Sequence, residues 1–499
     1  MNGQDDVVRT IVAEVLDRLR PQLAGVSTAP PASSAPVGAG LRPARPGVSP
    51  ARPSVGDGVF ATVDEAVQAA ARAQSRLAAL PLAERGRIVA IVRRVCDERA
   101  EELGAMELAE TGIGRLDHKI EKLRIVQNVL GVEAMATQAR SDASGLTVIE
   151  HAPWGVIGMV LPATHSVPTM ASNAVNVLAA GNTAVFCPHP AAARVAAYAL
   201  AIMNREIARA TGITNVITTL AEPSIQATEE VFHHPGVALL CVTGGPVVVR
   251  AAMQAGKRVI AAGPGNPPVV VDESADLDCA AAAIIEGAAY DNNLLCIGEK
   301  EVFVVATVAE AFVAALERAG AHKLNARQIE RLTQAAFTFE EGQGKGCGRA
   351  HVKKELIGRD PAVLARAAGA SAPAGVPLLF GETPEDHPFV REEQMMPFLP
   401  VVRVPDFEHA VAAAQRAEAG YRHTAVIHSR NVDNVTLMAR VMNTTLFVQN
   451  GPSTAALGGK GAGYLSYSIA TPTGEGVTTP MTFTRERQIA VAGGALRIH

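Results

Sequence analysis

The sequence predicts an α/β fold built around mostly parallel β-sheets. Short runs rich in Val, Ile and Leu alternate along the chain with longer, Ala-rich segments whose apolar residues recur at helical spacing. Glycine-containing turns follow several of these runs. Strands that alternate with helices favour a parallel sheet with helices on both faces.

The first 55 residues differ from the rest. Residues 1–20 predict an amphipathic helix, because their apolar residues fall on one helical face (Val7, Val8, Ile11, Val12, Val15, Leu16 and Leu19). Asp5 and Asp6 suit its positive end, and Pro21 stops it. Residues 21–55 predict a Pro-rich disordered linker. The helix either packs on its own body or an oligomer partner, or docks as a targeting peptide into a groove on another protein.

The body begins near Phe60. Helices are expected at residues 64–80, 82–111, 115–139, 168–180, 191–211, 246–255 and 280–289. Strands are expected at residues 144–151, 154–161, 183–187, 237–242, 269–271, 301–305, 401–404 and 425–428.

The bulk composition indicates a globular enzyme of two or three domains. Of 499 residues, 48% are apolar and 19% are charged, and the formal net charge is −4. So small a charge gives no reason to expect nucleic acid or anionic lipid as a partner. The six cysteines form no Cys-x-x-Cys pair, so we expect neither a disulfide framework nor a metal site, but a reducing cytoplasm. Neither a secretory signal nor a transmembrane segment is apparent.

One cysteine lies at a polar-to-apolar turn between an Ala-rich helical run and a strand-like run. The segment reads Asp291-Asn292-Asn293-Leu294-Leu295-Cys296-Ile297-Gly298-Glu299-Lys300. A thiol among backbone N–H groups can have its pKa lowered, and the thiolate attacks carbonyl carbons. The alternative is that Cys296 is a small hydrophobic core residue.

Thr243-Gly244-Gly245-Pro246 lies where a strand meets a helix N-terminus, which suits an anionic cofactor. An ordinary tight turn explains the segment equally well, and no Gly-x-Gly-x-x-Gly fingerprint accompanies it. Another strand ends at Cys187-Pro188-His189, where His189 either contacts a ribose or phosphate or simply caps the chain.

The remaining cysteines are weaker candidates. Cys347 and His351 could form a nucleophilic pair, but the glycines around Cys347 predict a loop that does not hold it in place. Cys96, Cys241 and Cys279 lie in apolar-periodic segments and are expected in the core.

Seven segments, taken in order, resemble the CoA-acylating aldehyde dehydrogenases of bacterial microcompartments, the enzymes of propanediol and ethanolamine utilisation that act on propionaldehyde or acetaldehyde. The resemblance runs from about residue 56 to the C-terminus. The segments are Ala152-Pro153-Trp154-Gly155-Val156-Ile157-Gly158, Pro162-Ala163-Thr164-His165, Ala179-Ala180-Gly181-Asn182-Thr183, Asn292-Asn293-Leu294-Leu295-Cys296, Glu393-Gln394-Met395-Met396-Pro397, Pro472-Thr473-Gly474-Glu475-Gly476 and Thr482-Phe483-Thr484-Arg485. Residues 1–20 with their tether are also similar to the encapsulation peptide of these enzymes.

The resemblance implies that Cys296 is the nucleophile and that its acyl thioester is the intermediate. Thr164 or His165 would complete the oxyanion site with the backbone N–H of Cys296. Hydrolytic relatives carry a general-base Glu where this chain reads Ala261-Ala262-Gly263-Pro264-Gly265-Asn266-Pro267, without a carboxylate. Coenzyme A is therefore the implied acceptor. The alternatives are a hydrolytic enzyme that recruits Glu393 or Glu299 as base, and a non-enzymatic shell-nucleating scaffold.

The resemblance also implies an NAD site. Thr243, Gly244 and Gly245 would hold the pyrophosphate, Pro188 and His189 would lie beside the cofactor, and Glu393 would hold the nicotinamide ribose. It implies a Rossmann-like cofactor domain at residues 56–262, a catalytic domain at residues 263–447, and a small β oligomerisation element from residues 139–153 and 478–499. A dimer or tetramer inside a microcompartment, with residues 1–20 on a shell or cargo protein, completes the expectation.

Overall fold

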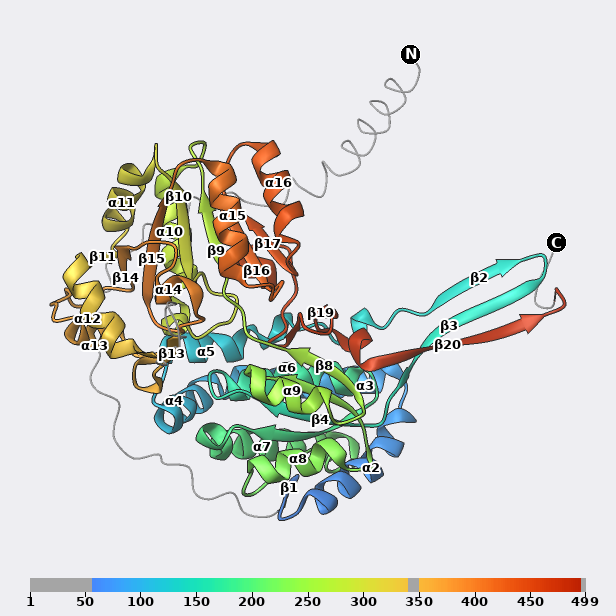
Figure 1. Ribbon diagram of the computed structural model, residues 1–499. Helices are drawn as coiled ribbons and strands as arrows, with labels where there is room; N and C mark the ends of the chain where they lie inside the picture. Colours follow the sequence, from blue (N-terminus) through green and yellow to red (C-terminus); the bar gives the residue numbers. More distant parts are fainter. Residues whose placement is uncertain (1–55, 340–349, 495–499) are drawn as a thin grey trace, which may run out of the picture. The chain divides into compact units, whose positions relative to one another are not determined.

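The computed structural model describes residues 56–339 and 350–494, and two parallel sheets dominate this part of the chain (Figure 1). The first sheet has the order β1-β6-β5-β4-β7-β8, and every pairing in it is parallel. Its strands are β1 (Val59–Phe60), β4 (Val156–Leu161), β5 (Thr183–Pro188), β6 (Ile217–Leu220), β7 (Val237–Thr243) and β8 (Arg258–Ala262). The predicted α/β class is confirmed.

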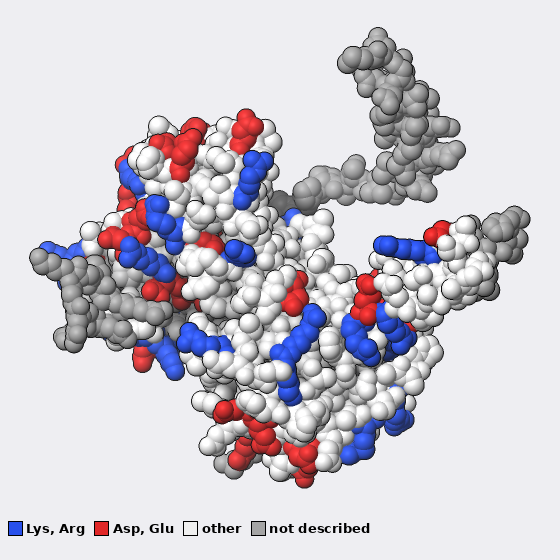
Figure 2. All heavy atoms as spheres, turned by 45° about the vertical axis from the view of Figure 1, so that its right-hand side comes forward, with Lys and Arg blue, Asp and Glu red and all other residues white. Residues whose placement is uncertain are grey.

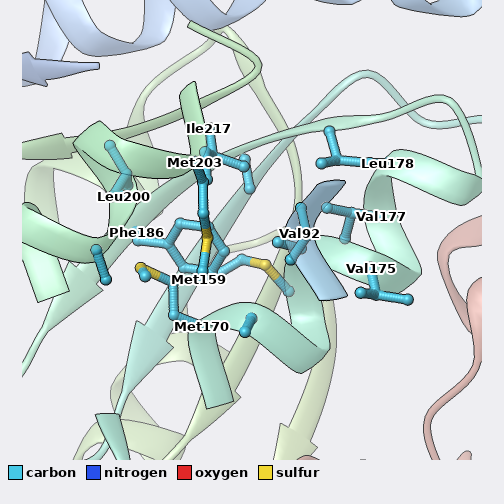
Figure 3. Packing of buried hydrophobic residues seen from close by; sticks show 14 of the residues in the cluster. Val92, Met159, Met170, Val175, Val177, Leu178, Phe186, Leu200, Met203 and Ile217 are labelled. Carbon is cyan, nitrogen blue, oxygen red and sulfur yellow. The ribbon is translucent and has the colours of Figure 1, made fainter. Parts of the chain in front are cut away.

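Helices cover both faces of the first sheet. On one face lie α3 (Leu82–Glu98), α6 (Ser166–Ala179) and α7 (Ala193–Thr211), with α4 (Ala100–Thr111) and α5 (Leu116–Arg124) beyond them. On the other lie α2 (Val63–Ala78), α8 (Ile225–His233) and α9 (Pro246–Met253). Figure 3 shows the first core, where Met159, Met170, Phe186 and Met203 converge from two strands and two helices. All fourteen residues of α6 are buried, so this helix is a fixed support for the residues just before its N-terminus.

The second sheet has the order β11-β14-β15-β10-β9-β16-β17 and is also parallel. Its strands are β9 (Pro268–Val271), β10 (Glu301–Val305), β11 (His322–Lys323), β14 (Leu379–Glu382), β15 (Phe398–Val404), β16 (Thr424–His428) and β17 (Leu446–Gln449). One apolar cluster packs α10 (Leu277–Ala289) and α11 (Ala309–Arg318) on this sheet. Another packs α15 (Phe407–Glu418) and α16 (Val432–Met442) on it.

Smaller elements complete the second half of the chain. The helices are α12 (Ala326–Ala336), α13 (Pro361–Ala367) and α14 (Pro388–Arg391). Two short antiparallel pairs join β12 (Phe337–Phe339) to β13 (Ala350–Val352) and β18 (Ile469–Ala470) to β19 (Gly476–Val477).

Three antiparallel strands form an arm that projects from the two sheets (Figure 1). They are β2 (Gln138–Asp142), β3 (Gly145–Pro153) and β20 (Thr484–Ala492), with β3 in the middle. The side chain of Asn182 connects the arm to the first sheet. Its Oδ1 accepts from Trp154 N at 2.7 Å and from Gly155 N at 3.0 Å. Its Nδ2 donates to Phe483 O at 2.8 Å. The strand of the arm therefore continues into β4 through a fixed junction.

The structure contradicts the expected extent of two helices and the expected burial of one cysteine. Residues 82–111 form two helices, because the chain turns at Arg99, which caps α3 with φ −109° and begins α4. Residues 115–139 are helical only to Arg124, followed by short 3₁₀ turns and the start of β2. Cys279 is exposed, because it lies in the first turn of α10 beside the capping side chain of Asp276. The amphipathic helix at residues 1–20, the linker and Cys347 lie outside the described residues.

The surface is mixed in charge. Basic and acidic side chains alternate over the face shown in Figure 2, in agreement with the small net charge. Within residues 56–339 and 350–494, every helix is too short or too polar to cross a bilayer.

Candidate active site

The segment before Cys296 has an unusual backbone. After α10 ends, Asp291, Asn292 and Asn293 take φ values of 48°, 56° and 66°, all in the left-handed region. Asp and Asn tolerate this region better than other non-glycine residues, but three in succession are costly. The segment must therefore be held by its surroundings, and all three side chains are buried.

Each of the three side chains is held by hydrogen bonds. Asp291 Oδ1 accepts from Arg115 N at 2.7 Å. Asn292 Nδ2 donates to Gly358 O at 3.0 Å and to Asp360 Oδ1 at 2.9 Å. Asn293 Nδ2 donates to Ala288 O and Glu299 O, both at 2.9 Å. These contacts come from elements on several sides, so they fix the loop that carries the cysteine.

A buried ionic cluster, which we call the lysine cluster, lies beneath this loop. It consists of Lys119, Lys122, Glu107 and Asp291, each at most 2% exposed. Lys122 Nζ lies 2.5 Å from Asp291 Oδ2, and Lys119 Nζ lies 3.3 Å from Glu107 Oε1. Burial alone would raise the pKa of Asp291, but Lys122 and Lys119 lower it overall.

The lysine cluster also reaches the opposite wall of the site. Lys119 Nζ donates to Thr164 O at 3.3 Å, and Val167 N donates to Glu107 Oε2 at 3.2 Å. The cluster therefore links the loop before Cys296 to the segment that carries Thr164 and His165. The sequence analysis missed both lysines, because their burial comes from contacts between distant elements.

Cys296 lines a cavity of about 260 Å³ together with His165. Apolar residues form much of the wall (Ile125, Leu295, Ile297, Leu457, Leu465 and Ile469), and Glu121, Glu286 and Lys460 add charged groups. Burial, and then the charge of Glu393, raise the pKa of the Cys296 thiol to about 12, while Lys300 and Lys122 act in the opposite direction. The expectation that the turn lowers this pKa is therefore not met, because burial outweighs the local N–H groups.

Thr164 and His165 act as a pair. Thr164 Oγ1 lies 2.8 Å from His165 Nδ1, and His165 is 5% exposed. Burial, followed by the positive charge of Lys122, lowers the pKa of His165 well below its usual value, so the ring is neutral. A neutral ring that accepts the Thr164 hydroxyl at Nδ1 carries its proton on Nε2. Of the two residues, His165 is the one that lines the cavity with Cys296.

The segment at residues 261–267 lies against the backbone of Cys296. A Cβ added to Gly265 would lie 2.6 Å from Cys296 O, so only glycine fits there. Gly265 N donates to Glu393 Oε1 at 3.2 Å. Burial raises the pKa of Glu393 to about 7, against the opposing effects of Lys300 and this hydrogen bond. Glu393 is thus a carboxylate bonded to this segment, which contains no carboxylate of its own.

His423 is a further residue that the sequence analysis missed. It is fully buried, and the added Cβ on Gly265 would lie 2.8 Å from its Cγ, so its ring and Cys296 O flank the same glycine. Its Nδ1 lies 2.8 Å from Thr424 Oγ1, and its Nε2 has no hydrogen-bond partner within the described residues. Burial, followed by Lys300, lowers the pKa of His423 to about 3. No motif in the sequence marks it.

The turn after β7 has an open surface. An added Cβ on Gly245 would meet nothing within 4 Å, and Pro246 opens α9 directly behind it. Ile225 on α8 and Val247 on α9 are 86% and 82% exposed, and both helices pack into the same core cluster. The hydroxyl of Thr243 is instead occupied, because its Oγ1 lies 2.7 Å from Ser468 Oγ. An uncrowded glycine, a helix N-terminus and exposed apolar side chains suit a dinucleotide.

His189 lies at the end of β5 after Pro188. Its Nδ1 accepts from Ala191 N at 3.1 Å and caps the following turn. Among the described residues, no group of three or more His, Cys, Asp or Glu side chains is placed to hold a metal ion.

The chain belongs to the aldehyde dehydrogenase family, whose sequence model matches residues 53–464. It is 44% identical over 433 residues to the acetaldehyde dehydrogenase (acetylating) EutE of Salmonella typhimurium, covering 86% of this chain and 91% of that protein. Its structure is similar to that of Rhodopseudomonas palustris propionaldehyde dehydrogenase with bound propionyl-CoA, with a TM-score of 0.84, 39% identity, and coverage of 88% of this chain and 96% of that one. It is also similar to a propionaldehyde dehydrogenase from the Clostridium phytofermentans fucose utilisation bacterial microcompartment, with a TM-score of 0.85, 37% identity, and coverage of 89% and 100%.

Proposed function

We propose that this chain catalyses the NAD-dependent, CoA-acylating oxidation of a short-chain aldehyde, such as acetaldehyde or propionaldehyde. The observation that carries the proposal is the position of Cys296 in a cavity beside neutral His165, with residues 261–267 packed against its backbone and free of carboxylates. The similarity to an acetylating enzyme and to a structure with bound propionyl-CoA supports the acceptor.

The reaction begins when the Cys296 thiol loses its proton to solvent and the resulting thiolate adds to the aldehyde carbonyl. The resulting oxyanion accepts hydrogen bonds from the backbone N–H of Cys296 and from Nε2 of His165, which Thr164 orients. NAD⁺, when bound, would supply the hydride acceptor. Loss of hydride leaves an acyl thioester on Cys296. The thiol of coenzyme A then loses its proton to solvent and attacks the thioester carbonyl as a thiolate, and Cys296 leaves as the thiolate.

Residues 56–262 form the cofactor domain in this proposal, and residues 263–447 form the catalytic domain. Gly244, Gly245 and the α9 N-terminus would hold the pyrophosphate, and exposed Ile225 and Val247 would pack against the adenine. Thr243 supports this turn through Ser468. Pro188 and His189 would border the cofactor, and His189 caps the turn there. Glu393 would bind the nicotinamide ribose.

A hydrolytic enzyme is the second candidate function, and Glu393 is the observation that favours it. With its pKa raised to about 7 by burial, this carboxyl could act as a general base for water. Glu299, the other candidate base, is occupied: its oxygens accept from Ser453 N and Ser453 Oγ, both at 2.8 Å.

Product analysis with acetaldehyde and propionaldehyde, with and without coenzyme A, separates the two functions. We expect acyl-CoA in proportion to NADH when coenzyme A is present, and little NADH beyond one turnover without it. Equal NADH formation and free acid without coenzyme A would refute acyl transfer. Loss of that acid formation in Glu393→Gln would then assign hydrolysis to Glu393.

The arm is assigned to oligomerisation through a second copy of this chain. Strands β2 and β20 form its two edges, most of their residues are exposed, and Ile489 is 48% exposed. An extended sheet with two open edges needs a partner to cover it. Light scattering on Ile489→Glu should show a smaller species than the unaltered protein; an unchanged mass would contradict the assignment.

Residues 1–20 are assigned to docking on a shell or cargo protein, which would place the enzyme inside a bacterial microcompartment. The amphipathic pattern of these residues and the microcompartment origin of one similar structure support this assignment. A variant without residues 1–20 should keep its turnover and lose co-purification with shell proteins. Unchanged co-purification would contradict the docking role.

A further inference from the structure

Lys300 lies four residues after the cysteine and immediately before β10. Its side chain is fully buried. Its ammonium donates to Asn293 O at 3.0 Å, to Asn293 Oδ1 at 2.5 Å and to Leu295 O at 3.0 Å. A lysine ammonium has three N–H donors, so all of them are directed at the loop that precedes Cys296.

The partners of Lys300 are not those of a typical structural lysine. A buried ammonium is costly unless it is paired with a carboxylate, as Lys122 is with Asp291. In the described part of the chain, no carboxylate lies within 4.0 Å of Lys300 Nζ. Glu299, Glu301 and Glu393 act on it from further away. Its positive charge is therefore placed against the carbonyl oxygens of the nucleophile loop.

We propose that Lys300 is a positioning residue for the nucleophile, whose ammonium clamps Asn293 and Leu295 and holds a positive charge beside the sulfur of Cys296. This role rests on the proposed function. The Lys300 ammonium would offset the negative charge of Glu393 whenever the sulfur of Cys296 is itself negative. This happens at the start of the reaction and again when coenzyme A displaces the sulfur.

The charges around the sulfur agree with this role. Glu393, Lys300 and Lys122 are the charged groups that act on Cys296: Glu393 raises its pKa and the two lysines lower it. Lys122 already neutralises Asp291, whereas Lys300 has no such close partner. Burial lowers the pKa of Lys300, and Glu393, Cys296, Glu301 and Glu299 oppose this. The anions on that side therefore favour the charged form of the lysine.

The test compares the reactivity of two cysteines in the same full-length protein. Iodoacetamide alkylation at pH 8, quantified by mass spectrometry of the peptides containing Cys296 and Cys279, reports their thiolate populations. We expect Lys300→Met to slow alkylation of Cys296 by about tenfold, the change that one pKa unit produces. Exposed Cys279, which belongs to α10 and carries its own contact with Asp276, should react at an unchanged rate. An unchanged Cys296 rate would overturn the proposal.

A second variant separates the charge from the clamp and covers the case in which Lys300→Met fails to fold. Asn293→Gly keeps the ammonium and suits the positive φ; it removes one acceptor of the clamp together with the Nδ2 donations to Ala288 O and Glu299 O. We expect its kcat to fall by about tenfold with KM for the aldehyde unchanged, because the nucleophile is misplaced but the substrate cavity is intact. An unchanged kcat would overturn the clamp. Alkylation uses neither aldehyde nor coenzyme A, so its outcome is independent of the proposed reaction.

Discussion

In the proposed reaction the turn after β7 and the segment before β10 both present backbone to a ligand, but they are built in opposite ways. The turn at Gly245 has open space on its ligand side and no strained residue. The segment from Asp291 to Cys296 has three left-handed residues, each held by buried hydrogen bonds. The difference follows from what each must do: binding requires an accessible backbone, whereas attack on a carbonyl requires a sulfur at one position.

The two regions also differ in how much backbone strain they contain. Strain of about 1–2 kcal/mol per left-handed residue is stored before Cys296 and offset by contacts made elsewhere. We therefore expect substitutions in the braced segment to affect both turnover and stability. Substitutions in the open turn should affect binding alone.

Removal of the nucleophile gives the largest expected effect. Cys296→Ser should reduce acyl-CoA formation by at least about 1000-fold, because a serine hydroxyl is far less acidic than a thiol and seldom forms the attacking anion. The measurement is NADH formation with propionaldehyde and coenzyme A. The thermal unfolding temperature should stay close to that of the unaltered protein. Residual turnover near the normal rate would remove Cys296 from the mechanism.

Breaking the lysine cluster should have the next largest effect. Asp291→Ala leaves Lys122 and Lys119 without their shared carboxylate, at a cost of about 3–5 kcal/mol, measured by urea unfolding. The matched control is Asp278→Ala, which removes an ion pair with Arg318 in which both side chains are more than half exposed. That substitution should cost under about 1 kcal/mol. Equal losses of unfolding free energy in the two variants would show that the buried charges do not stabilise the segment before Cys296.

Glu299 should make stability depend on pH. Burial raises its folded-state pKa from 4.5 to about 7. The folded protein therefore keeps this proton between these values while the unfolded chain releases it, so the stabilising contribution is complete below pH 4.5 and is lost as pH rises to about 7. Glu299→Gln can keep both hydrogen bonds to Ser453 and should lose less stability between pH 5 and pH 8 than the unaltered protein.

Thermal unfolding at the two pH values tests this prediction. Glu317→Gln, on the exposed side of α11, is the control and should follow the unaltered protein. If Glu299→Gln shows the same pH dependence as that control, Glu299 is already ionised in the folded state.

The smallest effect is expected in the open turn. Gly245→Val should raise KM for NAD⁺ by about tenfold, or 1.4 kcal/mol, because its side chain enters the space over the helix N-terminus. KM for the aldehyde and the unfolding temperature should not change. A loss of stability comparable to that of Asp291→Ala would remove the contrast between the two regions.

The order of strands and helices could be predicted from the sequence because it depends on local patterns. The run at residues 301–305 matches β10, and the predicted α/β class is confirmed. The predicted helix boundaries were wrong where the apolar spacing does not mark the end of a helix. The spacing continues through Arg99, although the backbone turns there.

Much of the site could not be predicted from local patterns. Cys296 was singled out by its turn, and His165 and Glu393 through resemblance. The structure places Cys296 and His165 on one cavity, and Glu393 and Cys296 O beside Gly265. Lys119, Lys122, Lys300 and His423 acquire their environment from elements far apart in sequence, so no local pattern marks them. One signal was present but unused: an Asp-Asn-Asn run before a cysteine indicates a left-handed turn.

Asn182 links the arm to the strand that leads to the candidate active site. The middle strand of the arm passes through the junction held by this amide, becomes β4, and ends just before Thr164 and His165. If two copies join along β20, as proposed, a displacement of the arm would pass along this continuous backbone to Thr164 and His165. Assembly would then affect the alignment of the proposed oxyanion donors.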